Sequence, residues 1–479
     1  MGRVTGLVNG ICRATCPGCI PHGSGKLDSL RYIFAIMIAI MSDRLRMGLI
    51  VIVAGVLLAA AAWWALPQLA AALPGRVRHY VPEALADIGV TPLPAALPAP
   101  TGTPAIASAL ALPSAVGRRP TAASPIGLPD AAAEPPAPQA PTQIPEATQA
   151  TVGGRPSAVA SPYARIADLP IIPQKFNNCG PTNLTIVLNH YGIDVDQFDV
   201  AAVARPNYED RNVSPRELVA YVREQTGLAA EVYAGGDVDL LRRLIAAGFP
   251  VIIEKGLEPD KKTGWMGHYL TVFGYDDITS HLLTRDTYLG PWRGDGLASY
   301  RDTERYWAQF NGTFIVVYPS ERAADLAELL GPRFADPATM WQAAADEARA
   351  LAVLTPTDPF VWFNLGTSLT ELARLGDASL YAAAAAAYDQ ARLLGLPARM
   401  LWYQFGPYEA YLAEGRHDDV LALAEATLGN QGGRNVEETY YYQGLALRMA
   451  GDEPGARAAF VRAARLNPES AIGRAAAGQ

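Results

Sequence analysis

The distribution of apolar and polar positions divides the chain into four stretches of different character. Residues 47–66 (MGLIVIVAGVLLAAAAWWAL) are apolar and uncharged, and residues 73–160 consist largely of alanine, proline, threonine and serine. Over 162–320 helical periodicity comes first and strand-like alternation follows, whereas 337–470 shows helical periodicity alone. The pattern therefore predicts an α+β domain followed by an all-α domain, both preceded by a membrane segment and a stalk.

The apolar run over 47–66 has about the ~20 residues that a helix needs to cross a bilayer. Arg44 and Arg46 precede it, and a pair of tryptophans lies near its far end, where aromatic rings favour the membrane interface. This arrangement predicts a single-pass anchor with segment 1–46 in the cytoplasm and the rest of the chain outside it. Segment 1–46 is alternatively a mis-assigned start, because Met41 begins an ordinary targeting sequence. A cleaved signal peptide is the alternative to a retained anchor.

The alanine- and proline-rich stretch over 73–160 contains almost no aromatic residues. Frequent proline prevents regular helix and sheet, and the stretch cannot bury enough apolar surface to offset its ordering entropy. We expect a disordered, extended stalk that holds the folded part away from the membrane and carries no chemistry.

Cysteine count and net charge exclude several classes of protein. The net charge of −8 provides no basic surface for nucleic acid. Cys12, Cys16 and Cys19 cluster near the N-terminus with His22, and Cys179 stands alone, so no disulfide is expected in the folded part. The three clustered cysteines lack a fourth ligand at ordinary spacing apart from His22, and we expect neither a metal site nor a cofactor.

The stretch over 162–320 predicts an α+β domain in which helices precede a mostly antiparallel sheet. Helices are expected from Cys179 onward, over Gln197–Ala204, from the capping box at Ser214 to Thr226, and after Asp237. The strand-like runs are 228–233, 249–254, 268–275, 281–286 and 313–318.

Cys179 lies where a polar loop (residues 173–178) turns into an apolar-periodic helix, with Pro181 in the first turn, where a missing N–H is tolerated. A thiol at a helix N-terminus experiences a partial positive charge, which favours the thiolate. The position therefore predicts a nucleophilic cysteine. A buried, inert cysteine is the alternative, and it is the commoner fate of a lone one.

A cysteine nucleophile requires a base, and the positions of the six histidines select His268. Two histidines precede the domain and one follows it, and His190 lies ~16 Å further along the helix of Cys179. A hairpin centred on Asp277 places His268 directly opposite Asp286, and His281 opposite Phe273. Asp286 would then orient the imidazole, as the third member of a triad does.

Gln174 precedes Cys179 by five residues and is the natural side-chain donor to an oxyanion. Its amide N–H and the backbone N–H of Cys179 would together stabilise negative charge that develops on a carbonyl oxygen.

These residues resemble the peptidase C39-like group of papain-like cysteine peptidases over about 165–320. The matching segments are 174–182 (QKFNNCGPT), 267–277 (GHYLTVFGYDD) and Asp286. The resemblance implies that Cys179 is the nucleophile, His268 the general base, Asp286 its orienting partner and Gln174 the oxyanion donor. Family members in bacteriocin exporters cleave leader peptides after a double glycine.

The chain departs from that family pattern in three places. Gln174 is one residue closer to the cysteine than in the transporter-linked members, and Thr287 stands where the family often has proline. Nothing in the chain resembles a phosphate-binding loop, so no transporter ATPase follows. These departures leave open whether double-glycine cleavage applies, whereas they affect the expected thiol chemistry little.

Aromatic–glycine motifs recur about every forty residues in the C-terminal stretch, at Trp362–Gly366, Trp402–Gly406 and Tyr440–Gly444. The last unit continues at the spacing of a tetratricopeptide repeat, and such arrays present a groove to a peptide or protein partner. Residues 339–354 are expected to form an unpaired linking helix. A bundle without repeat geometry is the alternative, and the tyrosines at 408, 411 and 440–442 either line the groove or pack in the core.

The leading hypothesis is a membrane-tethered, extracytoplasmic cysteine peptidase whose repeats recruit a peptide or protein substrate or a partner. The same triad would serve a thiol-dependent amidase or acyl transferase, which is the first alternative. The second alternative is a catalytically silent domain that binds peptides, with the repeats as the functional part.

Overall fold

The structure is a computed structural model, and it describes residues 96–110, 161–259, 263–291, 293–429 and 432–479. All of these belong to one compact unit, Pro92–Gln479. Segment 1–46, the apolar run over 47–66 and most of the predicted stalk lie outside the described residues. Among the residues that are described, no helix is both long enough and apolar enough to cross a membrane.

The helices predicted between 162 and 250 form where their start signals stand. The structure has α7 (Cys179–His190), α8 (Gln197–Ala204), α9 (Pro215–Gln225) and α10 (Val238–Ala246). The Ser214 hydroxyl accepts the amide N–H of Glu217 and the Glu217 carboxylate accepts that of Ser214, which is the predicted capping box. Asp237 caps α10 by accepting the amide of Leu240.

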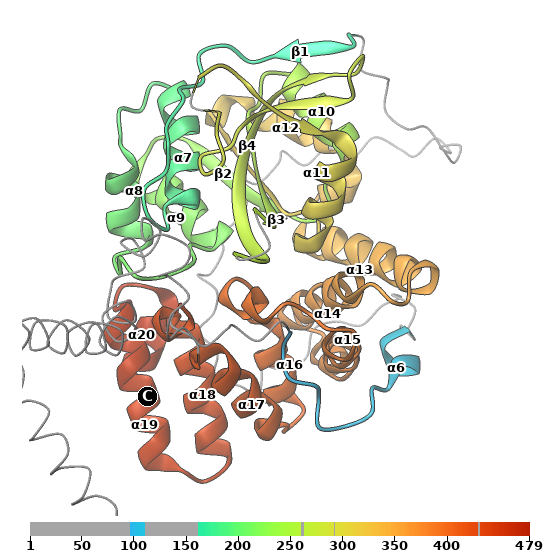
Figure 1. The fold of residues 1–479 in the computed structure, drawn as a ribbon, viewed down its shortest axis with the longest axis vertical. Coiled ribbons are helices and arrows are strands. Elements are labelled where there is room, and N and C mark those ends of the chain that lie inside the picture. Colours follow the sequence, from blue (N-terminus) through green and yellow to red (C-terminus); the bar gives the residue numbers. More distant parts are fainter. Residues whose placement is uncertain (1–95, 111–160, 260–262, 292, 430–431) are drawn as a thin grey trace, which may run out of the picture. The chain divides into compact units, whose positions relative to one another are not determined.

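Within the described residues, seven strands form one antiparallel sheet in the order β2-β7-β3-β4-β5-β6, with β1 paired to β4. Figure 1 labels β1, β2, β3 and β4 of this sheet. The strands are β1 (Tyr163–Arg165), β2 (Ala229–Tyr233), β3 (Val251–Leu257), β4 (Met266–Asp276), β5 (His281–Arg285), β6 (Gly296–Ser299) and β7 (Phe314–Tyr318). The α+β prediction is confirmed. The sequence did not predict β1, β6 or α11 (Tyr300–Trp307), because the two strands are too short to show alternation.

Helices cover both faces of the sheet. Tyr269 and Ile252 point toward the core shared with α7 and α9, whereas Leu270 and Ile253 point toward the core shared with α10 and α12 (Ala323–Leu330). Adjacent residues alternate between the two cores because successive side chains of a strand point to opposite faces. This arrangement brings the N-terminus of α7 next to β4.

The predicted register of the β4–β5 hairpin is wrong. Asp276, and not Phe273, lies opposite His281, and Thr271 lies opposite Arg285, with a bulge between Val272 and Gly274. The connection is longer than a turn centred on Asp277, because the Asp276 carboxylate accepts the amides of residues 278 and 279 and the turn continues through residue 280. Asp286 therefore follows the last paired residue of β5 and does not lie directly opposite His268.

The C-terminal part is all-helical, and each helix packs mainly against its neighbours along the chain. Its elements are α13 (Pro337–Leu354), α14 (Pro359–Arg374), α15 (Tyr381–Leu393), η5 (Ala398–Trp402), α16 (Gly406–Ala413), α17 (His417–Leu428), α18 (Glu437–Met449), α19 (Glu453–Leu466) and α20 (Ala471–Ala477). A side chain at Gly366 would come within 2.7 Å of the Tyr388 ring, and one at Gly444 within 2.6 Å of Phe460. These glycines let paired helices approach closely, as the sequence predicts.

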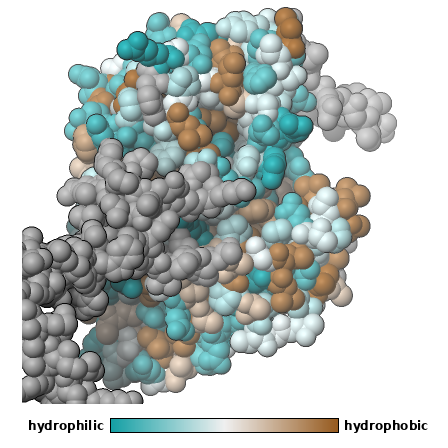
Figure 2. Space-filling model, viewed as in Figure 1, coloured by the Kyte–Doolittle hydropathy of each residue, from teal (hydrophilic) through white to brown (hydrophobic). Residues whose placement is uncertain are grey.

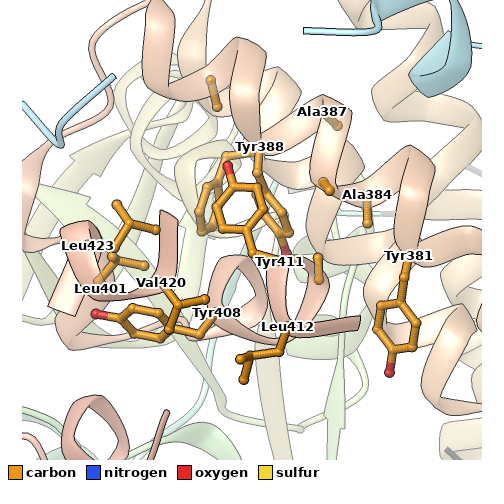
Figure 3. Close-up of a cluster of buried hydrophobic side chains, with 14 of the residues drawn as sticks. Tyr381, Ala384, Ala387, Tyr388, Leu401, Tyr408, Tyr411, Leu412, Val420 and Leu423 are labelled. Carbon is orange, nitrogen blue, oxygen red and sulfur yellow. The ribbon is translucent and has the colours of Figure 1, made fainter. Parts of the chain in front are cut away.

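Two expectations for this part differ from the structure, and one pair of alternatives is decided by it. The helix predicted over 339–354 is not unpaired, because α13 packs along α14. Trp402 ends the short helix η5 and Gly406 begins α16, so this motif does not repeat the geometry of the other two. For the tyrosines the structure shows the core alternative: Tyr408, Tyr411, Tyr441 and Tyr442 are buried, Tyr440 is partly buried against the same core, and Figure 3 shows the first two among its apolar side chains. Tetratricopeptide-type repeats are not confirmed.

Residues 96–110 lie within the stretch predicted as a disordered stalk, yet they pack on the helical domain. Leu97 is buried and its amide donates to the Leu396 carbonyl at 2.9 Å. The buried Arg392 guanidinium donates to the carbonyls of Pro98 and Ala99 at 2.8 and 3.0 Å. A buried guanidinium needs acceptors for its N–H groups, and this segment supplies two.

The surface of the folded part shows no single dominant apolar area on the face in Figure 2, where hydrophobic residues form small groups between hydrophilic ones. Scattered exposed apolar residues are normal for folded domains, so this face alone does not define a partner surface.

Candidate active site

The loop before Cys179 is held by the buried side chain of Gln197, the first residue of α8. The Gln197 Oε1 atom accepts the Lys175 amide at 2.6 Å and the Thr182 hydroxyl at 3.0 Å, and its Nε2 donates to the Pro173 carbonyl at 3.1 Å. One amide therefore fixes both the loop and the first turn of α7. This anchoring sets where the Cys179 thiol lies.

A left-handed residue and a buried arginine complete the turn into α7. Asn177 has φ +57°, a conformation that asparagine tolerates better than most residues, and its amide donates to the Asp210 carbonyl at 2.7 Å. Arg205 is 3% exposed and donates to the Asn178 side-chain oxygen at 2.6 Å. The half-buried Cys179 follows directly as the first residue of α7.

The structure brings His268 and Asp286 together although they are not directly opposite in the hairpin. His268 Nε2 lies 3.1 Å from Asp286 Oδ1, and the His268 side chain is fully buried. The same carboxylate oxygen accepts the amides of Tyr288 and Leu289 at 2.9 and 2.7 Å. These two amides hold the carboxylate in place. The carboxylate in turn orients the imidazole through Nε2, so Nδ1 is the ring nitrogen that remains for another contact.

The electrostatics of the three side chains favour an ion pair between Cys179 and His268. Burial alone would raise the pKa of the Cys179 thiol, but the His268 ring and the backbone amides of Tyr269 and Gly180 bring it below its usual value. Burial opposes the charged form of His268, yet Asp286 and then Cys179 raise the pKa of the imidazole to about 9. Burial likewise opposes ionisation of Asp286, and His268 still holds its pKa below the usual range.

Asn183 joins α7 to the strand that carries His268, and sequence reasoning did not identify it. Its side chain is fully buried, its oxygen accepts the Thr271 hydroxyl at 2.6 Å, and its amide nitrogen donates to the carbonyls of Cys179 and Tyr269 at 2.9 and 3.0 Å. A carbonyl only accepts, so these contacts fix which end of the amide is the nitrogen. The signal available in the sequence was a polar residue four positions after Cys179, on the same helix face.

The Thr287 hydroxyl connects the Asn183 side chain to the Gln174 side chain. The Asn183 amide nitrogen lies 3.3 Å from the Thr287 hydroxyl oxygen, and the Thr287 hydroxyl donates to Gln174 Oε1 at 2.9 Å. The Gln174 backbone amide also donates to the Thr287 carbonyl at 2.9 Å. Because its oxygen is already the acceptor in this chain of bonds, Gln174 keeps its Nε2 as a donor.

Among the residues that the structure describes, no group of three histidine, cysteine, aspartate or glutamate side chains is arranged to hold a metal ion. Cys12, Cys16, Cys19 and His22 lie outside that part of the chain.

Comparison with protein families identifies this part of the chain. Residues 166–315 match the model of the Peptidase_C39 like family. This match supports a peptidase C39-like domain over these residues. No curated protein matches the chain.

Three solved structures are similar to about a third of this chain. A C39-like peptidase from Bacillus anthracis is 19% identical with a TM-score of 0.27, covering 32% of this chain and 96% of that one. The double glycine motif protease of an AMS/PCAT transporter, solved with the leader peptide, is 20% identical with a TM-score of 0.25, covering 33% and 95%. The peptidase domain of Streptococcus ComA, a bifunctional ABC transporter of a quorum sensing pathway, is 19% identical with a TM-score of 0.26, covering 32% and 100%.

Proposed function

We propose that residues 162–320 are a cysteine peptidase domain in which Cys179 is the nucleophile, His268 the general base, Asp286 its orienting partner and Gln174 an oxyanion donor. The observation that supports this most strongly is the pairing of a thiol of lowered pKa at the start of α7 with an imidazole held 3.1 Å from a carboxylate. The match of residues 166–315 to the C39-like family supports the same class of reaction.

The proposed reaction begins with attack of the Cys179 thiolate on the carbonyl carbon of a peptide bond. The carbonyl oxygen becomes an oxyanion, to which Gln174 Nε2 and the Cys179 backbone amide donate. The His268 imidazolium gives its proton to the leaving amine, the C–N bond breaks, and a thioester remains on Cys179. Neutral His268 then takes a proton from water, whose oxygen attacks the thioester and releases the acid, and the proton returns to the Cys179–His268 pair.

A peptide-library digest with the full chain tests this proposal. Wild-type protein should hydrolyse a subset of peptides, and Cys179→Ala should hydrolyse none of them. An alkylatable, low-pKa Cys179 without any hydrolysis, but with acyl transfer to an added amine, would favour the amidase or acyl-transferase alternative. Binding of peptides without either reaction would favour the catalytically silent scaffold.

We further propose that the chain is tethered to a membrane through residues 47–66 and that the helical domain recruits a substrate or a protein partner. The apolar run and its flanking arginines support the tether, and the packing of successive helices in series supports recruitment. A reporter fused after residue 160 should be active only outside the cytoplasm. Cytoplasmic activity of that reporter would contradict the proposed topology.

Replacing Thr287 by valine should lower kcat by about 10- to 100-fold with little change in KM, because the Gln174 amide loses the bond that orients its donor. Thr287→Ser keeps the hydroxyl and should stay close to wild type. The double variant with Gln174→Ala should be no slower than Gln174→Ala alone, since both changes remove the same contribution. Steady-state kinetics on a peptide from the digest measure all three, and additive losses would contradict the relay from Thr287 to Gln174.

A further inference from the structure

Two arginines from different domains are anchored on the segments that flank Cys179 and His268. Arg211 donates to the Asn177 side-chain oxygen at 3.3 Å, two residues before Cys179, and its guanidinium lies 5.0 Å from the centre of the Phe176 ring. Arg399, at the start of η5 in the helical domain, donates to the carbonyls of Thr263 and Trp265 at 2.6 and 3.2 Å. Trp265 precedes His268 by three residues.

Tyr403, the residue after η5, packs against the residue next to His268. Its ring lies against the backbone of Gly267, the neighbour of His268, where a Cβ atom would come within 3.0 Å of the ring carbons. Tyr403 also packs on Trp265 and Phe310, with ring centroids 6.0 and 5.9 Å apart. Burial is the main factor that raises the pKa of the Tyr403 hydroxyl, and the charge of Cys179 raises it further. The residue after η5 is therefore part of the surroundings of the nucleophile.

The charges of the two arginines are poorly compensated. The carboxylate of Glu209 approaches Arg211 only to 3.9 Å and that of Asp210 acts on it as well, whereas Arg399 donates to two backbone carbonyls and forms no ion pair within the described part of the chain. The Nε atoms of both side chains are buried and make no hydrogen bond within the described part of the chain. Both side chains are nevertheless partly exposed, so an incoming acceptor would pair with their remaining N–H groups and not with the buried Nε atoms.

The pKa shifts of Arg211 and Arg399 agree with this incomplete compensation of their charges. Burial lowers the pKa of Arg211, Glu209, Tyr403 and Asp210 oppose that effect, and the charge of Arg399 makes the smallest contribution, which lowers it further. Burial also lowers the pKa of Arg399, while the hydroxyls of Tyr403 and Tyr288 act in the opposite direction. Two like charges near one another are relieved by an anion placed between them.

We propose that Arg211 and Arg399 form a carboxylate-binding subsite beside Cys179 and His268, which takes an acidic side chain or the C-terminal carboxylate of a bound peptide. A guanidinium matches a carboxylate because its planar fork presents parallel N–H donors. The helical domain thereby contributes to substrate selection directly, through Arg399. The binding of a peptide at this subsite rests on the proposed function. The positive potential of the two arginines does not depend on peptide hydrolysis.

Alkylation of Cys179 by iodoacetate and by iodoacetamide measures that potential without any peptide. The two reagents differ mainly in charge, so the ratio of their rates at Cys179, resolved by peptide mass mapping of the full chain, reports the local field. Arg399→Gln and Arg211→Gln should each lower the iodoacetate-to-iodoacetamide ratio by about 3- to 10-fold. Arg399→Lys keeps the charge and should retain most of the ratio, and Arg349→Gln, an arginine of α13 paired with Asp346, should leave it unchanged.

Matched peptides then separate the two sources of carboxylate. Substitution of glutamine for glutamate near the scissile bond should raise KM by about 10-fold if an acidic side chain binds, and amidation of the C-terminus should do so if the terminal carboxylate binds. Either preference should disappear in Arg399→Gln.

An unchanged alkylation ratio in both glutamine variants would overturn the subsite, even if peptides were hydrolysed. Equal losses in Arg399→Lys and Arg399→Gln would overturn it as well, because the effect would then not follow the charge. A ratio that falls as predicted, in a protein that hydrolyses no peptide, would support the subsite and count against the proposed peptidase.

Discussion

Replacing His268 by alanine should lower kcat/KM for peptide hydrolysis by about 10²- to 10⁴-fold, because the change removes both the acceptor of the thiol proton and its donor to the leaving amine. The imidazole is also the strongest influence that lowers the pKa of Cys179 against the effect of burial. The variant should therefore lose the rapid alkylation of Cys179 at neutral pH. Kinetics on a peptide from the library digest and site-resolved alkylation measure the two effects separately.

His281 provides the matched control for this prediction. It lies half-buried at the start of β5, opposite Asp276, and its ring contacts the Thr279 carbonyl at 2.6 Å. His281→Ala should leave hydrolysis and alkylation within about 2-fold of wild type, since the ring touches only a turn. Equal rates for His268→Ala and wild type would contradict the assignment of His268 as the base.

The second large effect is expected on stability, at Asp419 in the helical domain. Its carboxylate pairs with Arg392 at 2.9 Å, both side chains being 1% exposed, and also accepts N–H groups of Arg416 at 2.7 Å and the Thr101 hydroxyl at 2.7 Å. Asp419→Ala leaves the buried Arg392 charge without its partner. The unfolding free energy should fall by about 3–5 kcal/mol. Urea unfolding followed by far-ultraviolet circular dichroism measures the loss.

Asp346→Ala is the control, because the Asp346 carboxylate, which pairs with Arg349, is 58% exposed. Exposed pairs contribute about 1 kcal/mol or less, so this variant should unfold close to wild type. If the Asp419→Ala variant were as stable as the control, that result would contradict the prediction. The buried pair, and with it the docking of residues 96–110, would then contribute little to the unfolding free energy.

Local signals in the sequence were sufficient to predict most helices of the C39-like domain. The capping box at Ser214, the cap at Asp237 and the apolar periodicity after Cys179 act within a few residues, so they can be read without knowing the fold. The hairpin register failed because it depends on the length of the connection after Asp276 and on a bulge beside Val272, which the alternation pattern does not show.

The candidate site was only partly accessible from the sequence. Cys179, His268 and Asp286 followed from residue type and elimination, and the structure places the last two in contact. The residues that hold them, such as Asn183 and Thr287, have no chemical signature of their own, because their role comes from contacts between segments about a hundred positions apart.

The contribution of the helical domain was not predictable from its repeat-like motifs. Glycines such as Gly366 correctly indicated close packing of helices. Arg399 and Tyr403, however, lie in and directly after η5, where the motif pattern predicted an ordinary repeat helix. Their approach to the loop before His268 depends on how the two domains pack, which periodicity does not encode.

The central claim is that Cys179 and His268 form a thiolate–imidazolium pair at neutral pH, and the pH dependence of iodoacetamide alkylation at Cys179 tests it most directly. The rate should rise through an inflection below the usual cysteine pKa of ~8.5 and change again near pH 9, where His268 loses its proton. Asp286→Asn removes a negative charge that stabilises the imidazolium, so it should shift the second inflection to lower pH. A single inflection at or above ~8.5 that Asp286→Asn leaves in place would contradict the claim.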